Sequence, residues 1–150
     1  MERNLIKIDI FSDITCPWCL IGFKNLQKAI STLEEHNKFE INWLAFELHP
    51  FIPSSGLNKK DFMKSNLRDL KEIKETSKYL IELGKAIGFT FHFSNNNPIP
   101  NTFHAHRLVW YLKSMKLQSK LVEALFFSYF TQGINISDNF FVVLFKIIIA

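Results

Sequence analysis

The sequence contains little cysteine and little concentrated positive charge. Cys16 and Cys19 are the only cysteines among its 150 residues, which excludes a small secreted scaffold held together by several disulfides. The formal net charge is only +4, and Lys59 and Lys60 form the only pair of adjacent lysine or arginine residues. Because no strip of Lys and Arg alternates with aromatic residues, the sequence argues against a nucleic-acid partner.

Long apolar runs are also absent near the N-terminus. The opening stretch, MERNLIKIDIF, interrupts its apolar residues with Lys7 and Asp9 and lacks the apolar segment of a secretory signal. The apolar residues 140–150 are too few to span a bilayer and include Lys146. These absences predict a cytoplasmic protein with no membrane partner. In that compartment a close cysteine pair is more often catalytic or metal-binding than structural.

The overall amino-acid composition indicates one soluble globular domain. Apolar residues make up 47% of the chain and charged residues 21%, which is typical of folded soluble proteins. Sixteen phenylalanines predict an interior rich in aromatic side chains. The phenylalanines expected to serve mainly as core packing are Phe89, Phe91, Phe93, Phe126, Phe127 and Phe130.

The first fifty residues have the pattern of a strand, a helix and a second strand. Apolar and polar residues alternate over residues 5–11 and again over residues 39–46, as in half-buried strands. Between them, residues 17–33 repeat apolar residues every three or four positions, and Pro17 suits the first turn of a helix. This βαβ unit predicts two parallel strands with a right-handed crossover. The expected buried side of the helix consists of Leu20, Phe23, Leu26, Ile30 and Leu33.

The rest of the chain is predicted to be mainly helical. Asn101 or Thr102 is the expected N-cap of one helix, and Gly133 is expected to end another. The predicted helices cover residues 59–87 in one bent or two separate pieces, 102–115, 118–131, and a last apolar stretch opened by Ser137 and Asp138.

Cys16 and Cys19 lie at the predicted turn between the first strand and its helix. The first N–H groups of a helix lack internal partners and carry partial positive charge, so a thiolate at Cys16 is stabilised and its pKa should fall. Cys19 lies three residues further on the same helix face, where it can attack a mixed disulfide formed at Cys16. Pro17 and Trp18 between them are expected to shape the turn and support the site. We therefore predict a redox dithiol.

Two other interpretations of the cysteine pair stay open at this point. A zinc site would need two further ligands, and none of the five histidines shows a ligand spacing, so no metal is expected. Both cysteines could also be buried core residues, because free cysteine is often buried.

Four stretches in the same order resemble the DsbA-like thioredoxin superfamily. They are similar to the branch of FrnE-type oxidoreductases, which is related to the 2-hydroxychromene-2-carboxylate isomerases and the kappa-class glutathione transferases. The similarity extends from about Ile6 to about Asp138. The four stretches are DIFSDITCPWCLIG, FELHPFIPSSG, PNTFHAHRLVWYL and EALFFSYFTQGINISD.

The resemblance implies an α/β fold in which the N-terminal βαβ half of a thioredoxin fold, residues 1–50, is followed by an all-helical insertion, residues 51–150. It implies protein thiol–disulfide exchange by Cys16 and Cys19, with no cofactor beyond a thiol pool such as glutathione. The expected partners are thiol or disulfide substrates, either proteins or glutathione. Asn101 and His106 match family positions in a helix near the active site and are candidates for supporting it; a helix cap and a packed histidine are the alternatives.

The chain departs from the family pattern at its C-terminal end. The resemblance leads us to expect that the insertion ends prematurely and that the family's later strands and cis-proline loop are absent. An unpaired edge on the second strand would then favour self-association. Two alternatives to the dithiol enzyme therefore remain: a glutathione-dependent isomerase or transferase of the same superfamily, and an inactive truncated remnant.

Overall fold

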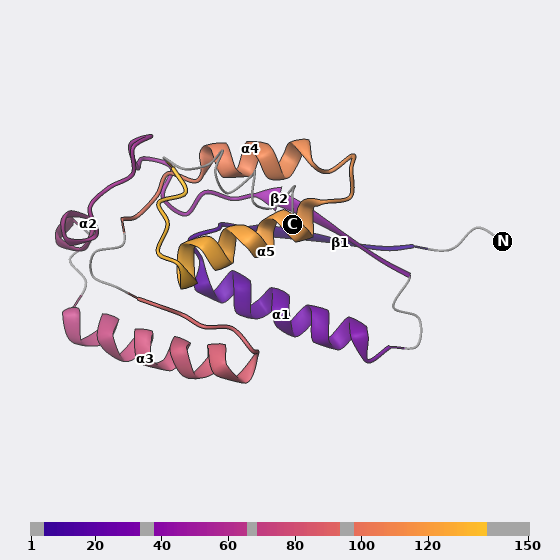
Figure 1. Cartoon of the computed structure of the whole chain (residues 1–150), viewed down its shortest axis with the longest axis horizontal. Helices are drawn as coiled ribbons and strands as arrows, with labels where there is room; N and C mark the ends of the chain where they lie inside the picture. The colour runs from indigo at the N-terminus through magenta and orange to yellow at the C-terminus, as the bar shows by residue number, and fades with distance from the viewer. Residues whose placement is uncertain (1–4, 34–37, 66–68, 94–97, 138–150) are drawn as a thin grey trace.

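A parallel pair of strands joined by one helix forms the N-terminal part of the protein. The computed structural model describes residues 5–33, 38–65, 69–93 and 98–137. Strand β1 (Ile6–Ser12) pairs in parallel with β2 (Phe39–Ala45), and α1 (Pro17–Ser31) connects them. Figure 1 shows α1 on one side of the strands and α4 on the other. The predicted βαβ unit and its parallel pairing are confirmed.

The apolar face of α1 is narrower than predicted. Leu20, Ile21 and Phe23 are buried, but Leu33 is 46% exposed. The helix ends at Ser31, so Leu33 lies past the last turn and does not share the buried face. The prediction of a buried Leu33 is therefore wrong.

Helices make up most of the chain that follows β2. The predicted segment 59–87 divides into two helices, and the helix predicted at 102–115 is shorter than expected. After Tyr111 the N–H groups of Lys113, Met115 and Lys116 donate to carbonyls three residues back, so tight turns replace the helix, and the last of these residues has a left-handed φ of 58°. The elements are α2 (Lys59–Ser65), α3 (Leu70–Ala86), α4 (Phe103–Tyr111), α5 (Gln118–Phe126) and the π-helical turn η2 (Phe127–Thr131).

Gly133, with a φ of 69°, follows η2 as predicted. The last apolar helix predicted from Ser137 and Asp138 lies outside the described residues. Within the ranges that the structure describes, no helix is long and apolar enough to cross a membrane.

A buried glutamine pairs with the outer edge of β2. The Gln118 Oε1 atom accepts a hydrogen bond from the Trp43 N–H at 3.1 Å, and its Nε2 donates to the Trp43 carbonyl at 3.2 Å. The same Nε2 donates to the Val109 carbonyl at 3.0 Å. The expectation that β2 has an unpaired edge is therefore wrong at Trp43, because a side chain there takes the place of a neighbouring strand.

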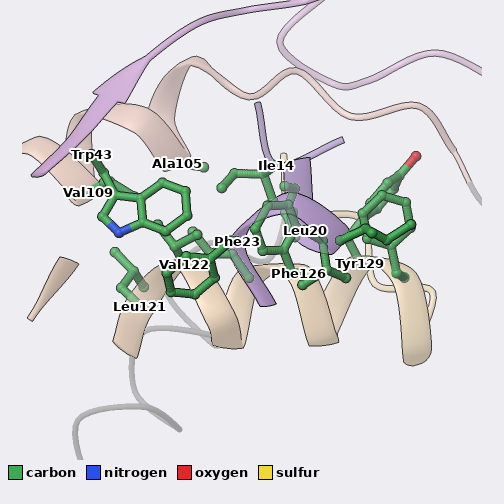
Figure 2. Packing of buried hydrophobic residues seen from close by; sticks show 14 of the residues in the cluster. Ile14, Leu20, Phe23, Trp43, Ala105, Val109, Leu121, Val122, Phe126 and Tyr129 are labelled. Atoms are coloured by element: carbon green, nitrogen blue, oxygen red, sulfur yellow. The ribbon is translucent and has the colours of Figure 1, made fainter. Parts of the chain in front are cut away.

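The main core lies between α1, β2, α4 and α5. Figure 2 shows Trp43, Phe23 and Phe126 among the packed side chains. The rings of Phe23 and Trp43 meet edge to face, with centroids 4.7 Å apart. Because this cluster combines residues from before and after residue 50, the N-terminal βαβ unit and the following helices share one core.

The phenylalanine predictions hold with one exception. Phe91 and Phe130 are buried, and Phe91 stacks on Phe93 with ring centroids 5.3 Å apart. Phe126 is fully buried, whereas Phe127 is 47% exposed. Adjacent residues on a helix point in different directions, so Phe127 cannot share the buried face of Phe126.

Candidate active site at the start of helix α1

The turn between β1 and α1 holds both cysteines as free thiols. Cys16 is the N-cap of α1, in an extended conformation, and Pro17 occupies the first helical position. The Cys16 Sγ atom accepts a hydrogen bond from the Cys19 N–H at 3.2 Å. The cap role normally filled by a serine or aspartate oxygen is filled here by sulfur, which is therefore held against the positive end of the helix.

The two thiols interact, and each affects the ionisation of the other. The Cys16 thiol, which donates to the sulfur of Cys19, lowers the pKa of Cys19 to about 6, and the backbone of Asp13 and the hydroxyl of Ser12 lower it further. The same interaction, together with burial, raises the pKa of Cys16. The prediction of a lowered pKa at Cys16 alone is therefore corrected: the pair, acting as one unit, loses its first proton easily.

Asp13 is a buried carboxylate three residues before the first cysteine, with only 1% of its surface exposed. Its Oδ2 accepts from the Leu48 N–H at 2.6 Å, and its Oδ1 accepts from the Thr15 N–H at 3.2 Å. Burial raises the pKa of Asp13, but His106 and these two N–H groups outweigh burial, so the net pKa is lowered. Asp13 thereby ties the cysteine turn to the segment that follows β2.

His106 approaches the active-site turn through Asp13. It lies on α4, is buried, and places its Nε2 atom 3.7 Å from the Asp13 Oδ1 atom. That distance is an electrostatic contact rather than a hydrogen bond, and this Nε2 has no hydrogen-bond partner among the described residues. His104, two residues earlier, is exposed, as expected for a residue on another side of the helix.

Asn101 has a structural position at the start of α4. Its Oδ1 atom accepts from the Phe103 N–H at 3.0 Å, and its Nδ2 donates to the Ile52 carbonyl at 2.7 Å. Its backbone N–H donates to the Ser137 hydroxyl at 2.7 Å. Thr102 occupies the N-cap position but makes no side-chain cap hydrogen bond. The contacts of Asn101 thus match the alternative of a helix cap, and they connect three loops.

Trp18, between the two cysteines in the chain, is 49% exposed. Its ring contacts Tyr79 of α3, with centroids 6.1 Å apart. The active-site turn is therefore in contact with the helices that follow β2.

A pocket of about 190 Å³ opens at the turn before α1, and Cys16 itself is not part of its wall. Thr15 and Pro17, the neighbours of Cys16 on either side, contribute to its wall. Lys59 also lines the pocket, and burial lowers its pKa. The remaining lining is Phe62, Met63, Ile73, Ser77, His92, Phe93, Ile99, Tyr129 and Phe130. A mostly apolar pocket with a few polar groups suits a small organic group carried next to a sulfur atom.

Within the described ranges, no three His, Cys, Asp or Glu side chains come together as a metal site would require. Cys16 and Cys19 instead contact each other and the end of the helix.

Sequence reasoning missed Asp13 and Lys59 as members of the site. The only signal for Asp13 was an acidic residue at the end of an apolar strand, a position equally typical of an exposed loop. Lys59 belongs to the pair of adjacent lysines and looked like part of a solvated helix. Only the tertiary packing distinguishes these two residues from ordinary surface charges.

The chain was compared with known protein families, curated proteins and solved structures. The family described as DSBA-like thioredoxin domain matches residues 7–146. YwbO of Bacillus subtilis, an uncharacterised protein, is 26% identical over 138 residues, which cover 89% of this chain and 60% of YwbO.

The crystal structure of a probable DsbA oxidoreductase from Streptomyces coelicolor superposes with a TM-score of 0.82 at 20% identity. That match covers 94% of this chain and 62% of the other, and at this identity it shows the fold alone. This chain thus spans about three fifths of the length of both proteins. The family match extends over nearly the whole chain, so the protein belongs to the DSBA-like thioredoxin domain family.

Proposed function

We propose that this protein is a protein thiol–disulfide oxidoreductase that uses Cys16 and Cys19. The observation that carries the proposal is the contact of the two free thiols at the start of α1, where Cys16 Sγ accepts the Cys19 N–H at 3.2 Å. A thiolate in this position is stabilised by the helix end and by the second thiol. Both cysteines are present, which favours the dithiol, FrnE-type branch of the superfamily.

In the proposed reaction, the Cys16 thiolate attacks one sulfur of a substrate disulfide. The substrate S–S bond breaks, one substrate sulfur leaves as a thiolate that takes up a proton, and a mixed disulfide forms at Cys16. Cys19 then loses its proton and attacks the Cys16 sulfur, which releases the second substrate thiol. The substrate gains two electrons, and the protein is left with a Cys16–Cys19 disulfide. A thiol pool such as glutathione supplies the electrons that reduce this disulfide again.

A redox titration tests the proposal. The purified chain is equilibrated in buffers of reduced and oxidised glutathione, and the oxidised fraction is read from Trp18 fluorescence and from alkylation of the cysteines. We expect one sharp midpoint that differs clearly from the midpoint of a free CPWC peptide, because the fold stabilises the reduced pair. A midpoint equal to that of the peptide would contradict the proposal.

A glutathione-dependent isomerase or transferase is the second candidate, and the pocket at the turn before α1 favours it. Lys59 in that pocket offers a positive charge to a carboxylate, and the apolar wall offers space for a second substrate. This candidate requires saturable binding of reduced glutathione, measured by calorimetry on the Cys19→Ser variant. Glutathione binding that is lost in Lys59→Met but persists without Cys19 would favour the isomerase or transferase over the oxidoreductase. Absence of binding would exclude it.

A further inference from the structure

We infer that the outer edge of β1 pairs with the same edge of a second copy of this chain. The two β1 strands run antiparallel, with Ile8 of one copy opposite Ile8 of the other, so that the two sheets join into one. The inference goes beyond the proposed function and does not depend on it, because it concerns how the chain assembles. It rests on the exposure of β1 and on the order of residues along it.

Strand β1 presents an open edge in the part of the chain that the structure describes. The sheet there consists of β1 and β2, so β1 has a neighbouring strand on one side only. Three large apolar side chains along it are exposed, Leu5 by 49%, Ile6 by 51% and Phe11 by 67%. An edge strand offers its N–H and C=O groups to a further strand, and exposed apolar side chains beside it favour a protein partner.

The two faces of β1 carry different patterns, because side chains alternate along a strand. One face carries three isoleucines. The other has a basic and an acidic residue in the middle and an apolar residue at each end. This second pattern is the same in both directions except that the charge changes sign, so the strand complements itself when it is reversed. The first face consists of Ile6, Ile8 and Ile10, and the second of Leu5, Lys7, Asp9 and Phe11.

A two-fold axis at Ile8 brings these patterns into register. An axis perpendicular to the sheet keeps every residue on its own face, and symmetry forms each pair of residues twice. Lys7 of each copy then lies opposite Asp9 of the other, which gives two cross-strand pairs of opposite charge. Apolar residues also meet apolar residues, because the remaining pairs are Leu5 with Phe11 and Ile6 with Ile10.

The two neighbouring registers are unfavourable. An axis at Asp9 places two carboxylates opposite each other, and an axis at Lys7 places two ammonium groups opposite each other. Like charges directly opposite destabilise an antiparallel pair, whereas opposite charges stabilise it. The charges of β1 therefore select the register at Ile8.

The residues of β2 extend this charge pattern across the joined sheet. Lys7 lies beside Glu40 in the register of β1 with β2, and Asp9 lies beside Asn42, whose Nδ2 donates to the Asp9 Oδ1 at 2.8 Å. In the joined sheet each Lys7 thus lies between two carboxylates, Glu40 of its own copy and Asp9 of the other. An amino group between two carboxylates is a favourable arrangement on an exposed face.

The pairing leaves both cysteine turns accessible. Each turn follows the C-terminal end of its own β1, and antiparallel strands place these ends on opposite sides of the dimer. With the axis at Ile8, the two Ser12 residues are eight positions apart along the strands, or about 27 Å.

The first test measures self-association of the chain by analytical ultracentrifugation over a range of concentrations. Because symmetry doubles each contact, Lys7→Asp and Asp9→Lys are each expected to raise the dimer dissociation constant roughly tenfold or more. Lys28→Asp is the matched control, because it makes the same change of charge at an exposed position of α1 and should leave the dimer intact. Circular dichroism checks that each variant is folded.

The decisive sample is an equal mixture of the Lys7→Asp and Asp9→Lys chains. One chain then carries two acidic residues and the other two basic residues, so every cross-strand charge pair is attractive again. We expect the mixture to form a heterodimer although each variant alone is largely monomeric. A mixture that stays monomeric, an unmodified chain that is monomeric at every concentration, or a dimer that neither variant weakens would overturn the inference.

A second measurement covers the case in which a charge variant fails to fold. Only the residue on the axis meets its own copy, and the Cα atoms of opposite residues lie about 4.5–5.5 Å apart, within reach of a disulfide. In a background that lacks Cys16 and Cys19, oxidation of the Ile8→Cys variant should give a covalent dimer. Ile10→Cys is its control, because that residue lies opposite Ile6. Equal crosslinking of both variants, or none of Ile8→Cys, would contradict the inference.

Discussion

Replacement of Cys16 by serine is expected to reduce disulfide exchange to the rate of the buffer thiols alone. A serine hydroxyl is not ionised at neutral pH and cannot form a mixed disulfide, so the first step is lost entirely. Replacement of Cys19 by serine should have a different result, because Cys16 can still attack but nothing resolves the product. Insulin reduction measures the first variant, and mass spectrometry of the trapped mixed disulfide measures the second.

The proposed reaction assigns the first attack to Cys16, the N-cap residue of α1. The Cys16 Sγ atom caps α1 and accepts a hydrogen bond from the Cys19 N–H at 3.2 Å, so a thiolate at Cys16 would be stabilised by the end of the helix. The interaction of the two thiols lowers the pKa of Cys19 and raises that of Cys16, which favours the opposite order of attack, so trapping of the mixed disulfide decides between the two orders. A mixed disulfide that accumulates in Cys16→Ser instead of in Cys19→Ser would reverse the assignment.

Phe126→Ala is expected to lower the free energy of unfolding strongly, because it removes a ring from the core. The Phe126 side chain is fully buried and packs near the Phe130 ring, with centroids 6.2 Å apart. Loss of a buried phenylalanine ring costs about 3–5 kcal/mol of unfolding free energy, because the site loses apolar contacts and keeps a cavity. Urea unfolding followed by circular dichroism measures this loss.

Phe127→Ala is the matched control for this measurement. The substitution is the same and Phe127 is the next residue in the chain, at the start of η2, but its side chain is 47% exposed. Its removal should change the unfolding free energy by less than about 1 kcal/mol. Similar losses of unfolding free energy in both variants would contradict the buried position of the Phe126 side chain.

The sequence predicted the local elements well and their long-range contacts poorly. The βαβ unit was predictable because alternation in the two strands and helical spacing in α1 are local patterns. The end of α4 at Tyr111 was not predictable, because the helical pattern continues in the sequence while the following residues form tight turns that end at a left-handed Lys116. Nothing in the local sequence marks Lys116, among the lysines nearby, as the residue that adopts a positive φ.

The candidate site shows the same difference between local sequence patterns, which were predictable, and long-range contacts, which were not. Cys16, Pro17, Trp18 and Cys19 form a contiguous motif whose chemistry follows from its spacing and from the helix that begins there. Asp13 adjoins the motif in sequence, but its contact with His106 forms because α4 brings that histidine from a distant part of the chain. No local pattern encodes that approach, so only the packing of α4 could reveal it.

Gln118 has a consequence for the direction in which this sheet can grow. Its amide presents one acceptor and one donor to Trp43, as a peptide group of a neighbouring strand would do. A strand that approached β2 from outside would have to displace both hydrogen bonds and expose a buried amide, which is costly. Among the described residues β1 pairs only with β2. A strand added to this sheet, from this polypeptide or another, would therefore pair with β1 more easily than with β2. β1 is the strand that leads directly into the cysteine turn.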